Sequence, residues 1–139
     1  MSDVHSSEIR SYNMSRIRSK NTLPEIIVRK ALFANGFRFR IHDKRLPGKP
    51  DIVLKKYNMV IFVHGCFWHG HSRCKYFIIP KTRTGWWLQK INRNRELDAL
   101  NTKEIRQRGW DVVIIYECDL KGKKFEPFIR RLIRRIKKS

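Results

Sequence analysis

Two short runs of apolar residues limit what this chain can fold into. They are Met59–Val63 (MVIFV) and Val112–Tyr116 (VVIIY), and neither approaches the ~20 residues that a membrane-spanning helix needs. The second run, within 111–117, has the continuous apolar character of a buried strand. The first belongs to a predicted β-hairpin, in which 51–54 and 59–64 pair around a turn at 55–58. The chain is therefore expected to build a sheet that other elements cover.

The segment before the hairpin predicts a helix followed by a strand. Thr22 can cap the helix, Pro24 fits its first turn, and Glu25 stands where a capping box needs an acidic residue. An apolar stripe follows, and Asn35-Gly36 predicts the helix end. The stripe consists of Ile26, Ile27, Ala31 and Leu32. Alternating apolar residues at Phe37, Phe39 and Ile41 then indicate a strand.

Two more helices are expected after the hairpin. The first runs from 87 to 108, and the second is a basic helix from 125 to 138. The first carries a loose apolar stripe made of Leu88, Ile91, Leu97, Leu100 and Ile105. The stripe of the second consists of Phe128, Ile129, Leu132, Ile133 and Ile136. The order α-β-β-β-α-β-α predicts an α/β fold, in which a mixed sheet is flanked by helices.

The charge of the chain predicts a polyanionic partner. Among 139 residues, 32 Lys and Arg stand against 12 Asp and Glu, a net charge of +20. Such a surface repels itself unless a polyanion neutralises it, and nucleic acid is the first expectation. An anionic membrane surface and a merely basic soluble protein are the alternatives. We expect a basic arm over 1–21 and a single domain over 22–139. The first residues lack the apolar core of a signal peptide, which favours an intracellular protein with reduced thiols.

Thiols and imidazoles are concentrated in VHGCFWHGHSRC, residues 63–74. Cys66, His71 and Cys74 could share one ion at little cost in loop closure, and Cys118 beyond the last strand would complete a tetrahedral set. Such a closed Cys3His set is typical of structural zinc. His69 could take the place of His71, because spacing alone does not choose between them. The alternative is three buried free thiols without a metal.

A second constellation has the chemistry of a hydrolase. Asp51 starts one hairpin strand, and His64 ends the strand that returns beside it. A carboxylate there can hold Mg²⁺, and a nearby imidazole such as His64 or His69 can move a proton near neutral pH. Glu25 could reach this site from the first helix. The structural alternatives are that Asp51 is only a turn residue and that Glu25 serves only the capping box.

Two pairs of adjacent aromatic residues accompany these groups. Phe67-Trp68 lies inside the cysteine- and histidine-rich loop, and Trp86-Trp87 follows the basic loop 81–85. Rings on a cationic surface can stack on bases or wedge open a base step, and a mismatched step is cheaper to open. Adjacent residues point in different directions, so one ring of each pair could instead belong to the core.

Several segments together resemble the very-short-patch-repair (Vsr) DNA mismatch endonucleases. The segments that carry the resemblance are Asp3-Val4-His5, Asn13-Met14, Leu46–Asp51 (LPGKPD), Val60–His69 (VIFVHGCFWH), Pro80–Thr84 (PKTRT), Trp87–Ile91 (WLQKI) and Glu117-Cys118. The match runs from about residue 3 to about residue 122, nearly the whole chain. The resemblance implies a restriction-endonuclease-like fold with a structural zinc site. It also implies Mg²⁺-dependent nicking of one strand, 5′ to the T of T·G mismatches that arise when 5-methylcytosine deaminates.

The same resemblance implies roles for single residues in catalysis. Asp51 would be the metal carboxylate and His69 the catalytic histidine, with Glu25 and His64 assisting. The usual nuclease signature has a second acidic residue and a lysine on the next strand, where this chain has Val63-His64-Gly65. The family often has Thr at position 63. A Mg²⁺ ion that binds the backbone carbonyl of residue 63 has the same ligand whether that residue is Thr or Val.

The resemblance also implies the zinc ligands and the residues that contact DNA. With His69 assigned to catalysis, His71 joins Cys66, Cys74 and Cys118 around Zn²⁺, although the loop is one residue longer than the family spacing. A bulge could absorb the extra residue. On the DNA side, Phe67, Trp68 and Trp87 would intercalate at the mismatch from the major groove, and the arm with Met14 would embrace the other side.

Two other functions remain open from the residues alone. One is a restriction-type or nonspecific nuclease of the same fold, and the other is a zinc-stabilised DNA-binding module without catalysis. Double-stranded DNA with a T·G mismatch is the expected partner, no membrane is expected, and a monomer is expected. The expected location is the bacterial cytoplasm, in association with the nucleoid.

Overall fold

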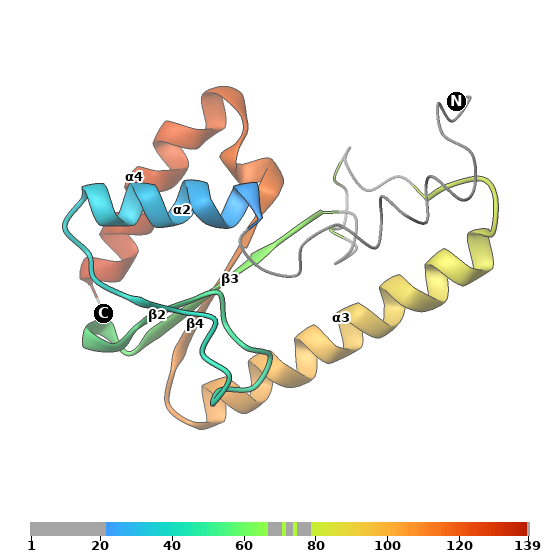
Figure 1. Cartoon of the computed structure of the whole chain (residues 1–139), viewed down its shortest axis with the longest axis horizontal. Helices are drawn as coiled ribbons and strands as arrows, with labels where there is room; N and C mark the ends of the chain where they lie inside the picture. Colours follow the sequence, from blue (N-terminus) through green and yellow to red (C-terminus); the bar gives the residue numbers. More distant parts are fainter. Residues whose placement is uncertain (1–21, 67–70, 72–73, 75–78, 139) are drawn as a thin grey trace.

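A computed structural model of the chain describes residues 22–66, 71, 74 and 79–138 (Figure 1). The helices and strands of these residues are α2 (Leu23–Ala34), β1 (Arg40–Ile41), β2 (Ile52–Leu54), β3 (Met59–His64), α3 (Thr84–Gln107), β4 (Asp111–Tyr116) and α4 (Phe125–Lys137). Three 3-10 turns add η1 (Lys55–Tyr57), η2 (Glu117–Leu120) and η3 (Gly122–Lys124). The order of helices and strands is the predicted one. Among the described helices, none has both the length and the apolar character that crossing a lipid bilayer demands.

The sheet is mixed, as predicted, and its strands lie in the order β1-β2-β3-β4. The β1–β2 and β2–β3 pairs are antiparallel, so the predicted hairpin is confirmed, whereas β3 and β4 run parallel. Asn58 closes the hairpin with a positive φ of 53°, and its side-chain amide donates to the carbonyl of Gly109 at 2.6 Å. All six residues of β3 are buried. The strand that ends at His64 is therefore the centre of the molecule.

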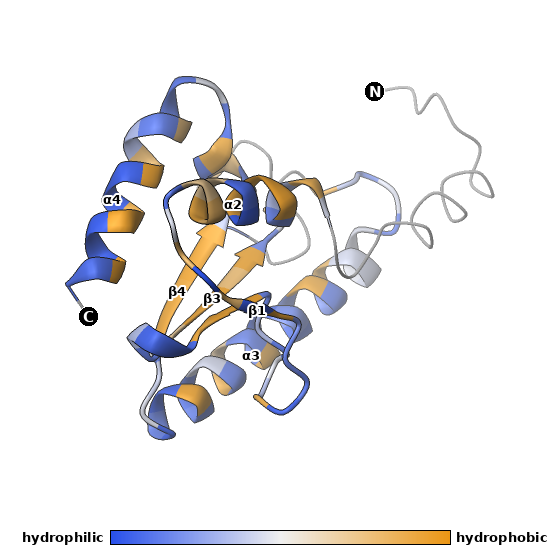
Figure 2. Ribbon diagram, turned by 60° about the vertical axis from the view of Figure 1, so that its left-hand side comes forward, coloured by the Kyte–Doolittle hydropathy of each residue, from blue (hydrophilic) through white to orange (hydrophobic). Residues whose placement is uncertain are grey.

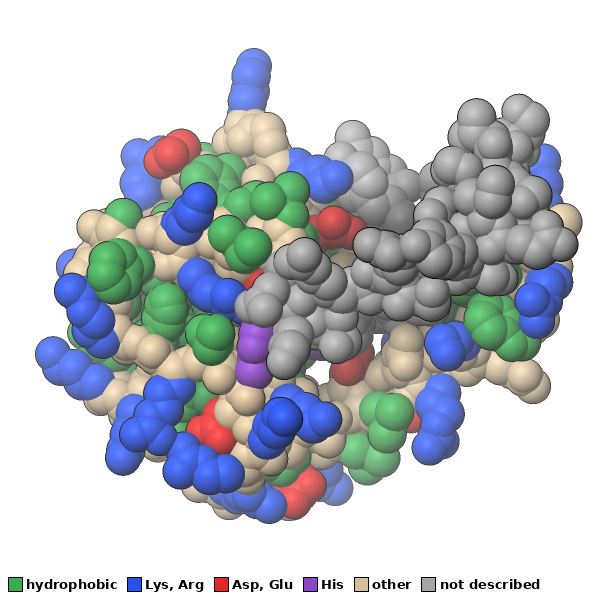
Figure 3. Space-filling view, viewed as in Figure 1, with side chains coloured by type: hydrophobic (Ala, Val, Ile, Leu, Met, Phe, Trp, Pro, Cys, Tyr) green, Lys and Arg blue, Asp and Glu red, His purple; other side chains and the backbone are tan. Residues whose placement is uncertain are grey.

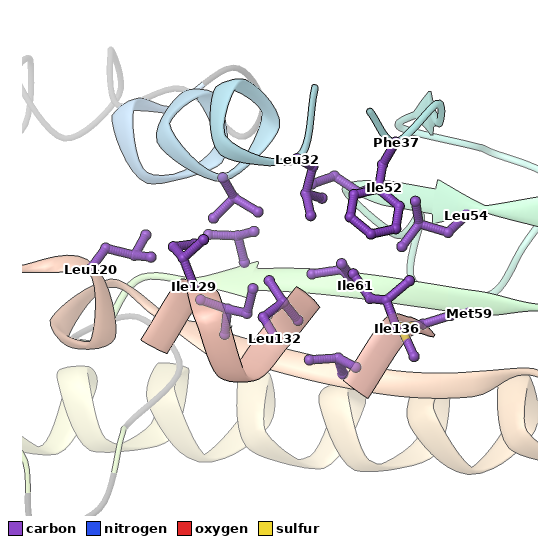
Figure 4. Packing of buried hydrophobic residues seen from close by; sticks show 14 residues of the cluster. Leu32, Phe37, Ile52, Leu54, Met59, Ile61, Leu120, Ile129, Leu132 and Ile136 are labelled. Carbon is purple, nitrogen blue, oxygen red and sulfur yellow. The ribbon is translucent and has the colours of Figure 1, made fainter. Parts of the chain in front are cut away.

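Helices cover both faces of this sheet. In Figures 1 and 2, α2 and α4 lie on one face, and α3 lies on the other. The larger core cluster joins α2 and α4 to the sheet, and Figure 4 shows Leu32, Ile129 and Leu132 meeting Ile61. The smaller cluster joins α3 to the opposite face through Val53, Val60, Phe62, Ile105 and Val112. Successive strand residues point to opposite faces, so β3 contributes to both cores.

The first predicted helix forms, but its N-terminus differs from the prediction. Thr22 makes no side-chain hydrogen bond to cap α2, and the Glu25 carboxylate contacts other side chains, described below. The C-terminus follows the prediction, because Asn35 is the C-cap and Gly36 has a φ of +87° that suits glycine. The strand expected from 37 to 41 is shorter, since only Arg40–Ile41 pairs with β2. Buried Phe37 packs edge-on against Tyr57 instead.

The apolar stripe predicted for α3 is wrong at three positions. Leu88, Leu97 and Leu100 are 42%, 42% and 63% exposed, whereas Ile91 and Ile105 are buried as expected. A helix of 24 residues is about 36 Å long, while a strand of six residues spans about 20 Å. Figure 1 shows α3 running well past the strands. The sheet therefore cannot cover one continuous stripe along the whole helix. In contrast, α4 has the predicted amphipathic form, with its apolar side facing the sheet in Figure 2.

Candidate active site and metal centre

A cluster of Glu25, His42 and Asp51 lies at one edge of the sheet. One ligand atom from each side chain lies within 4.8 Å of the others, and the three come from α2, the residue after β1 and the residue before β2. The β1–β2 register continues past Ile41 and Ile52, so His42 is opposite Asp51, and its backbone N–H donates to the Asp51 carbonyl at 3.3 Å. The sequence predicts that Glu25 and Asp51 share one site, and the structure brings them together.

The turn before Asp51 is fixed by packing against α3. Gly48 has a φ of +74°, and a Cβ on it would lie 3.0 Å from the side chain of Asn101. Glycine alone fits there without strain. Beyond the turn, Asp51 Oδ2 accepts the backbone N–H of Val63 at 2.6 Å. This short, charge-assisted bond ties the carboxylate to the central strand.

The Glu25 carboxylate is shared by two basic side chains. Its Oε2 lies 2.8 Å from Arg29 Nη2 and 2.9 Å from His42 Nε2. The Glu25 side chain is only 3% exposed, and the side chains of Arg29 and His42 are 17% and 18% exposed. A carboxylate this buried needs charged or hydrogen-bonded partners to remain ionised. Arg29 and His42 provide that compensation.

His64 lies on the face of β3 that packs against α3. Its Nδ1 is 3.9 Å from Asp98 Oδ2, and its ring meets Tyr116 edge-on at 5.7 Å and Phe62 at 5.8 Å. The ring is buried at the base of a hollow of about 540 Å³, which Lys103 also lines. The structure thus places this histidine beside an α3 carboxylate that sequence analysis did not consider.

Three thiols and an imidazole converge where β3 and β4 end. The ligand atoms of Cys66, His71, Cys74 and Cys118 all lie within 4.8 Å of one another, and the Cys118 sulfur is 3.4 Å from His71 Nδ1. The parallel β3–β4 pairing explains the convergence, because Cys66 follows the end of one strand and Cys118 follows the end of the other. The His71 ring stacks on Tyr116 at 3.7 Å. The predicted ligand set therefore comes together.

Burial changes the protonation of the thiols in this cluster. Burial, the largest cause, raises the pKa of Cys66 to about 12, and burial also raises the pKa of Cys118. The buried thiolates therefore carry a desolvation cost, and a divalent ion bound to them would offset it. Three sulfur ligands and one nitrogen ligand in a closed set match the chemistry of zinc.

The second aromatic pair is divided between core and surface. Trp87 is 6% exposed, whereas Trp86 is 41% exposed and meets the Trp87 ring edge-on at 4.6 Å. Cations flank the exposed ring, since the Arg83 guanidinium lies 4.7 Å from it and the Lys90 ammonium 5.6 Å. The other predicted site residues, Met14, Phe67, Trp68 and His69, lie outside the described residues.

Comparison with known proteins identifies the family. A family model described as DNA mismatch endonuclease Vsr matches residues 2–75. A type II nicking enzyme of Neisseria meningitidis, V.NmeAIP, is 49% identical over 99% of this chain and 98% of its own length. The DNA mismatch endonuclease Vsr of Escherichia coli is 44% identical over 89% of this chain and 79% of its own. The chain belongs to the Vsr family. It is a DNA mismatch endonuclease, and DNA is its partner.

Family membership gives a function to the acidic cluster and to the positively charged surface. In a Vsr-family endonuclease, carboxylates that share a sheet edge are candidates for the cleavage centre, and the positive surface has a polyanion to bind. Figure 3 shows Lys and Arg side chains spread over the visible face, with few acidic ones between them. His42, Arg29 and Asp98 were not among the residues that the sequence predicts for the site. The spacing of Glu25 and Arg29, four residues apart on a predicted helix, was the available signal for one of them.

Proposed function

We propose that this protein is a Mg²⁺-dependent, strand-specific endonuclease that nicks 5′ to the T of T·G mismatches formed by deamination of 5-methylcytosine. The observation that carries the proposal is the Glu25–His42–Asp51 cluster at the sheet edge of a Vsr-family chain. Relatives named as nicking enzymes support cleavage of one strand. A hairpin followed by a parallel strand, covered by helices on both faces, is compatible with a restriction-endonuclease-like fold. The enzyme is proposed to act as a monomer in the bacterial cytoplasm.

In the proposed mechanism, the Asp51 carboxylate would hold the Mg²⁺ ion. The Val63 N–H holds Asp51 Oδ2 at 2.6 Å, so the carboxylate keeps one orientation, and the Val63 carbonyl is the proposed second ligand. Bound Mg²⁺ would polarise the scissile phosphoryl oxygen. Glu25 orients the attacking water by accepting a hydrogen bond from it, and His69 moves the proton. His64 assists from the strand end, where its Nδ1 lies 3.9 Å from Asp98 Oδ2.

The thiol cluster is proposed to hold a structural Zn²⁺ ion. Cys66, His71, Cys74 and Cys118 would close the coordination sphere and leave no open position for catalysis. The segment 67–70 lies between two of these ligands in sequence, and it contains His69 and the aromatic pair Phe67-Trp68. An ion that joins this segment to the end of β4 would fix both the proton carrier and the aromatic wedges relative to Asp51.

DNA recognition is proposed to rest on aromatic wedges and on the basic arm 1–21. Phe67, Trp68 and Trp87 would open the mismatched step, which has less pairing to lose, and Met14 would contact the opposite side. Because Trp87 is buried in this structure, its insertion requires it to leave its packed position. Each stacked base contributes roughly 1–3 kcal/mol, which sets the scale of what one ring adds to mismatch binding.

The decisive experiment compares nicking of a T·G duplex with nicking of a fully paired duplex, with Mg²⁺ and with a chelator. Wild-type protein should nick only the mismatched duplex and only with Mg²⁺, and Asp51→Asn should bind that duplex without nicking it. Asp111→Asn is the matched control, because Asp111 begins β4 at the opposite end of the sheet from His64. Equal cleavage of paired DNA would favour the restriction-type alternative. Tight binding without any metal-dependent product would favour the non-catalytic module.

A further inference from the structure

We propose that His42 is a positioning residue for this cleavage centre and that it acts through Glu25 with the help of Arg29. The inference rests on the proposed function, since it assigns a task at the same site. It adds a residue that the sequence patterns did not mark, and it excludes His42 and Glu25 as ligands of the catalytic ion.

His42 is joined to both acidic residues of the cluster, to the backbone of Asp51 and to the carboxylate of Glu25. Its backbone N–H donates to the carbonyl of Asp51 at 3.3 Å, and its ring Nε2 lies 2.9 Å from Glu25 Oε2. One residue therefore fixes the backbone that carries the metal carboxylate and the side chain of the second acid. A displacement of His42 would change the spacing between Glu25 and Asp51.

The backbone conformation of His42 indicates that the surrounding structure holds this residue in position. Its φ is +48°, in the left-handed region that strains a residue with a side chain unless the surroundings hold it there. Strand β1 ends one residue earlier, at Ile41, and the chain bends at His42 while its N–H still bonds to Asp51. This bend allows its backbone to reach Asp51 while its ring reaches α2.

The charges around Glu25 argue against a metal ion between Glu25 and His42. Arg29 Nη2 lies 2.8 Å from Glu25 Oε2 and 3.2 Å from His42 Nε2, so a guanidinium already occupies the space where both ligand atoms face. A divalent cation on those atoms would stand next to this positive charge. Asp51, whose Oδ2 bonds to Val63, remains the anchor for the ion. Glu25 is thus held by Arg29 and His42, not by metal.

Two substitutions separate positioning from packing. His42→Leu fills the space without a donor, whereas His42→Gln places an amide N–H near the position of Nε2. In single-turnover nicking of the T·G duplex at saturating Mg²⁺, His42→Leu should slow cleavage roughly 10–100-fold, the usual cost of losing such a supporting residue. His42→Gln should keep most of the rate. Lys44→Leu, at an exposed position two residues on, is the matched control and should cleave like wild type.

A double-mutant cycle tests whether His42 acts through Glu25. If it does, Glu25→Gln combined with His42→Leu should cleave no more slowly than Glu25→Gln alone, with DNA affinity and the Mg²⁺ midpoint unchanged by His42→Leu. Additive losses of rate would overturn the inference. A higher Mg²⁺ midpoint in His42→Leu would also overturn it, because it would make His42 a ligand.

Failure of the proposed function would be visible separately. If wild-type protein does not nick the T·G duplex, that function is rejected, and the coupling of Glu25 and His42 is then decided by urea unfolding of the same four proteins. If the losses in free energy of unfolding from the two substitutions are not additive, the contact between Glu25 and His42 is supported. If the losses are additive, the contact is rejected by stability measurements alone.

Discussion

Replacing Glu25 by alanine removes the carboxylate that compensates Arg29 on the inner face of α2. The Arg29 guanidinium would then contact His42, whose Nε2 lies 3.2 Å from Arg29 Nη2. The buried Nε of Arg29 has no hydrogen-bond partner among the described residues. An ionised side chain left in this position loses its Coulomb compensation without gaining full hydration. Glu25→Ala should therefore destabilise the fold as well as impair the site.

The expected size follows from the burial of the two side chains. Breaking a fully buried ion pair costs about 3–5 kcal/mol. Glu25 is 3% exposed but Arg29 is 17% exposed, so water can reach part of the guanidinium, and we expect about 2–3 kcal/mol. For a chain of this length that is a fall in Tm of roughly 8–12 °C. Glu25→Gln, which keeps the shape and one acceptor, should cost about 1–2 kcal/mol.

Urea and thermal unfolding followed by circular dichroism would measure these values. The informative comparison is the double variant Glu25→Ala with Arg29→Met, which removes both charges and keeps the length of the arginine side chain. It should recover most of the loss, because the unpaired guanidinium is then gone. A double variant that is no more stable than Glu25→Ala alone would refute the reasoning, since the cost would then come from lost packing and not from charge.

Three other predictions concern the metal, the surface and the core. Cys118→Ser should bind less than one equivalent of zinc by elemental analysis and melt at a lower temperature, because a closed set that contributes part of roughly 10–16 kcal/mol loses one ligand. Asp43→Asn should lower stability by less than about 1 kcal/mol near neutral pH. Hydrogen bonds from Arg45 hold the Asp43 pKa at about 2, below the ordinary 3.8, so this difference should vanish in urea melts as the pH falls through about 2. Ile105→Ala should cost about 2–5 kcal/mol, whereas Leu100→Ala on the same helix should change stability by less than about 0.5 kcal/mol.

The hairpin could be predicted because its apolar pattern is local, and the thiol cluster could be predicted because the chain has few cysteines. Continuous apolar residues mark β3 and β4, and a tight connection separates β3 from β2. Cys66 and Cys74 are close in sequence, and Cys118 is the one cysteine left to join them. Neither prediction needed the relative direction of β3 and β4, which the structure supplied.

The rest depended on contacts that sequence periodicity does not contain. His42 sits in a turn with a positive φ, and nothing in its neighbours predicts that its ring will reach α2. Asp98 lies between exposed Leu97 and Leu100, on a helix whose apolar stripe the sequence pattern predicts wrongly because α3 extends beyond the sheet that would bury it. Trp86 and Trp87 could be divided into an exposed and a buried ring only after the helix phase was known.

The parallel pairing of β3 with β4 has a consequence for how the enzyme matures. Cys118 comes late in the chain, after the whole of α3, so a polypeptide still emerging from the ribosome has Cys66 and Cys74 but not their last companion. Pairing of distant parallel strands is intrinsically slow. A metal ion held by these four side chains would complete its coordination only after that step, so its binding would report that β3 and β4 have paired.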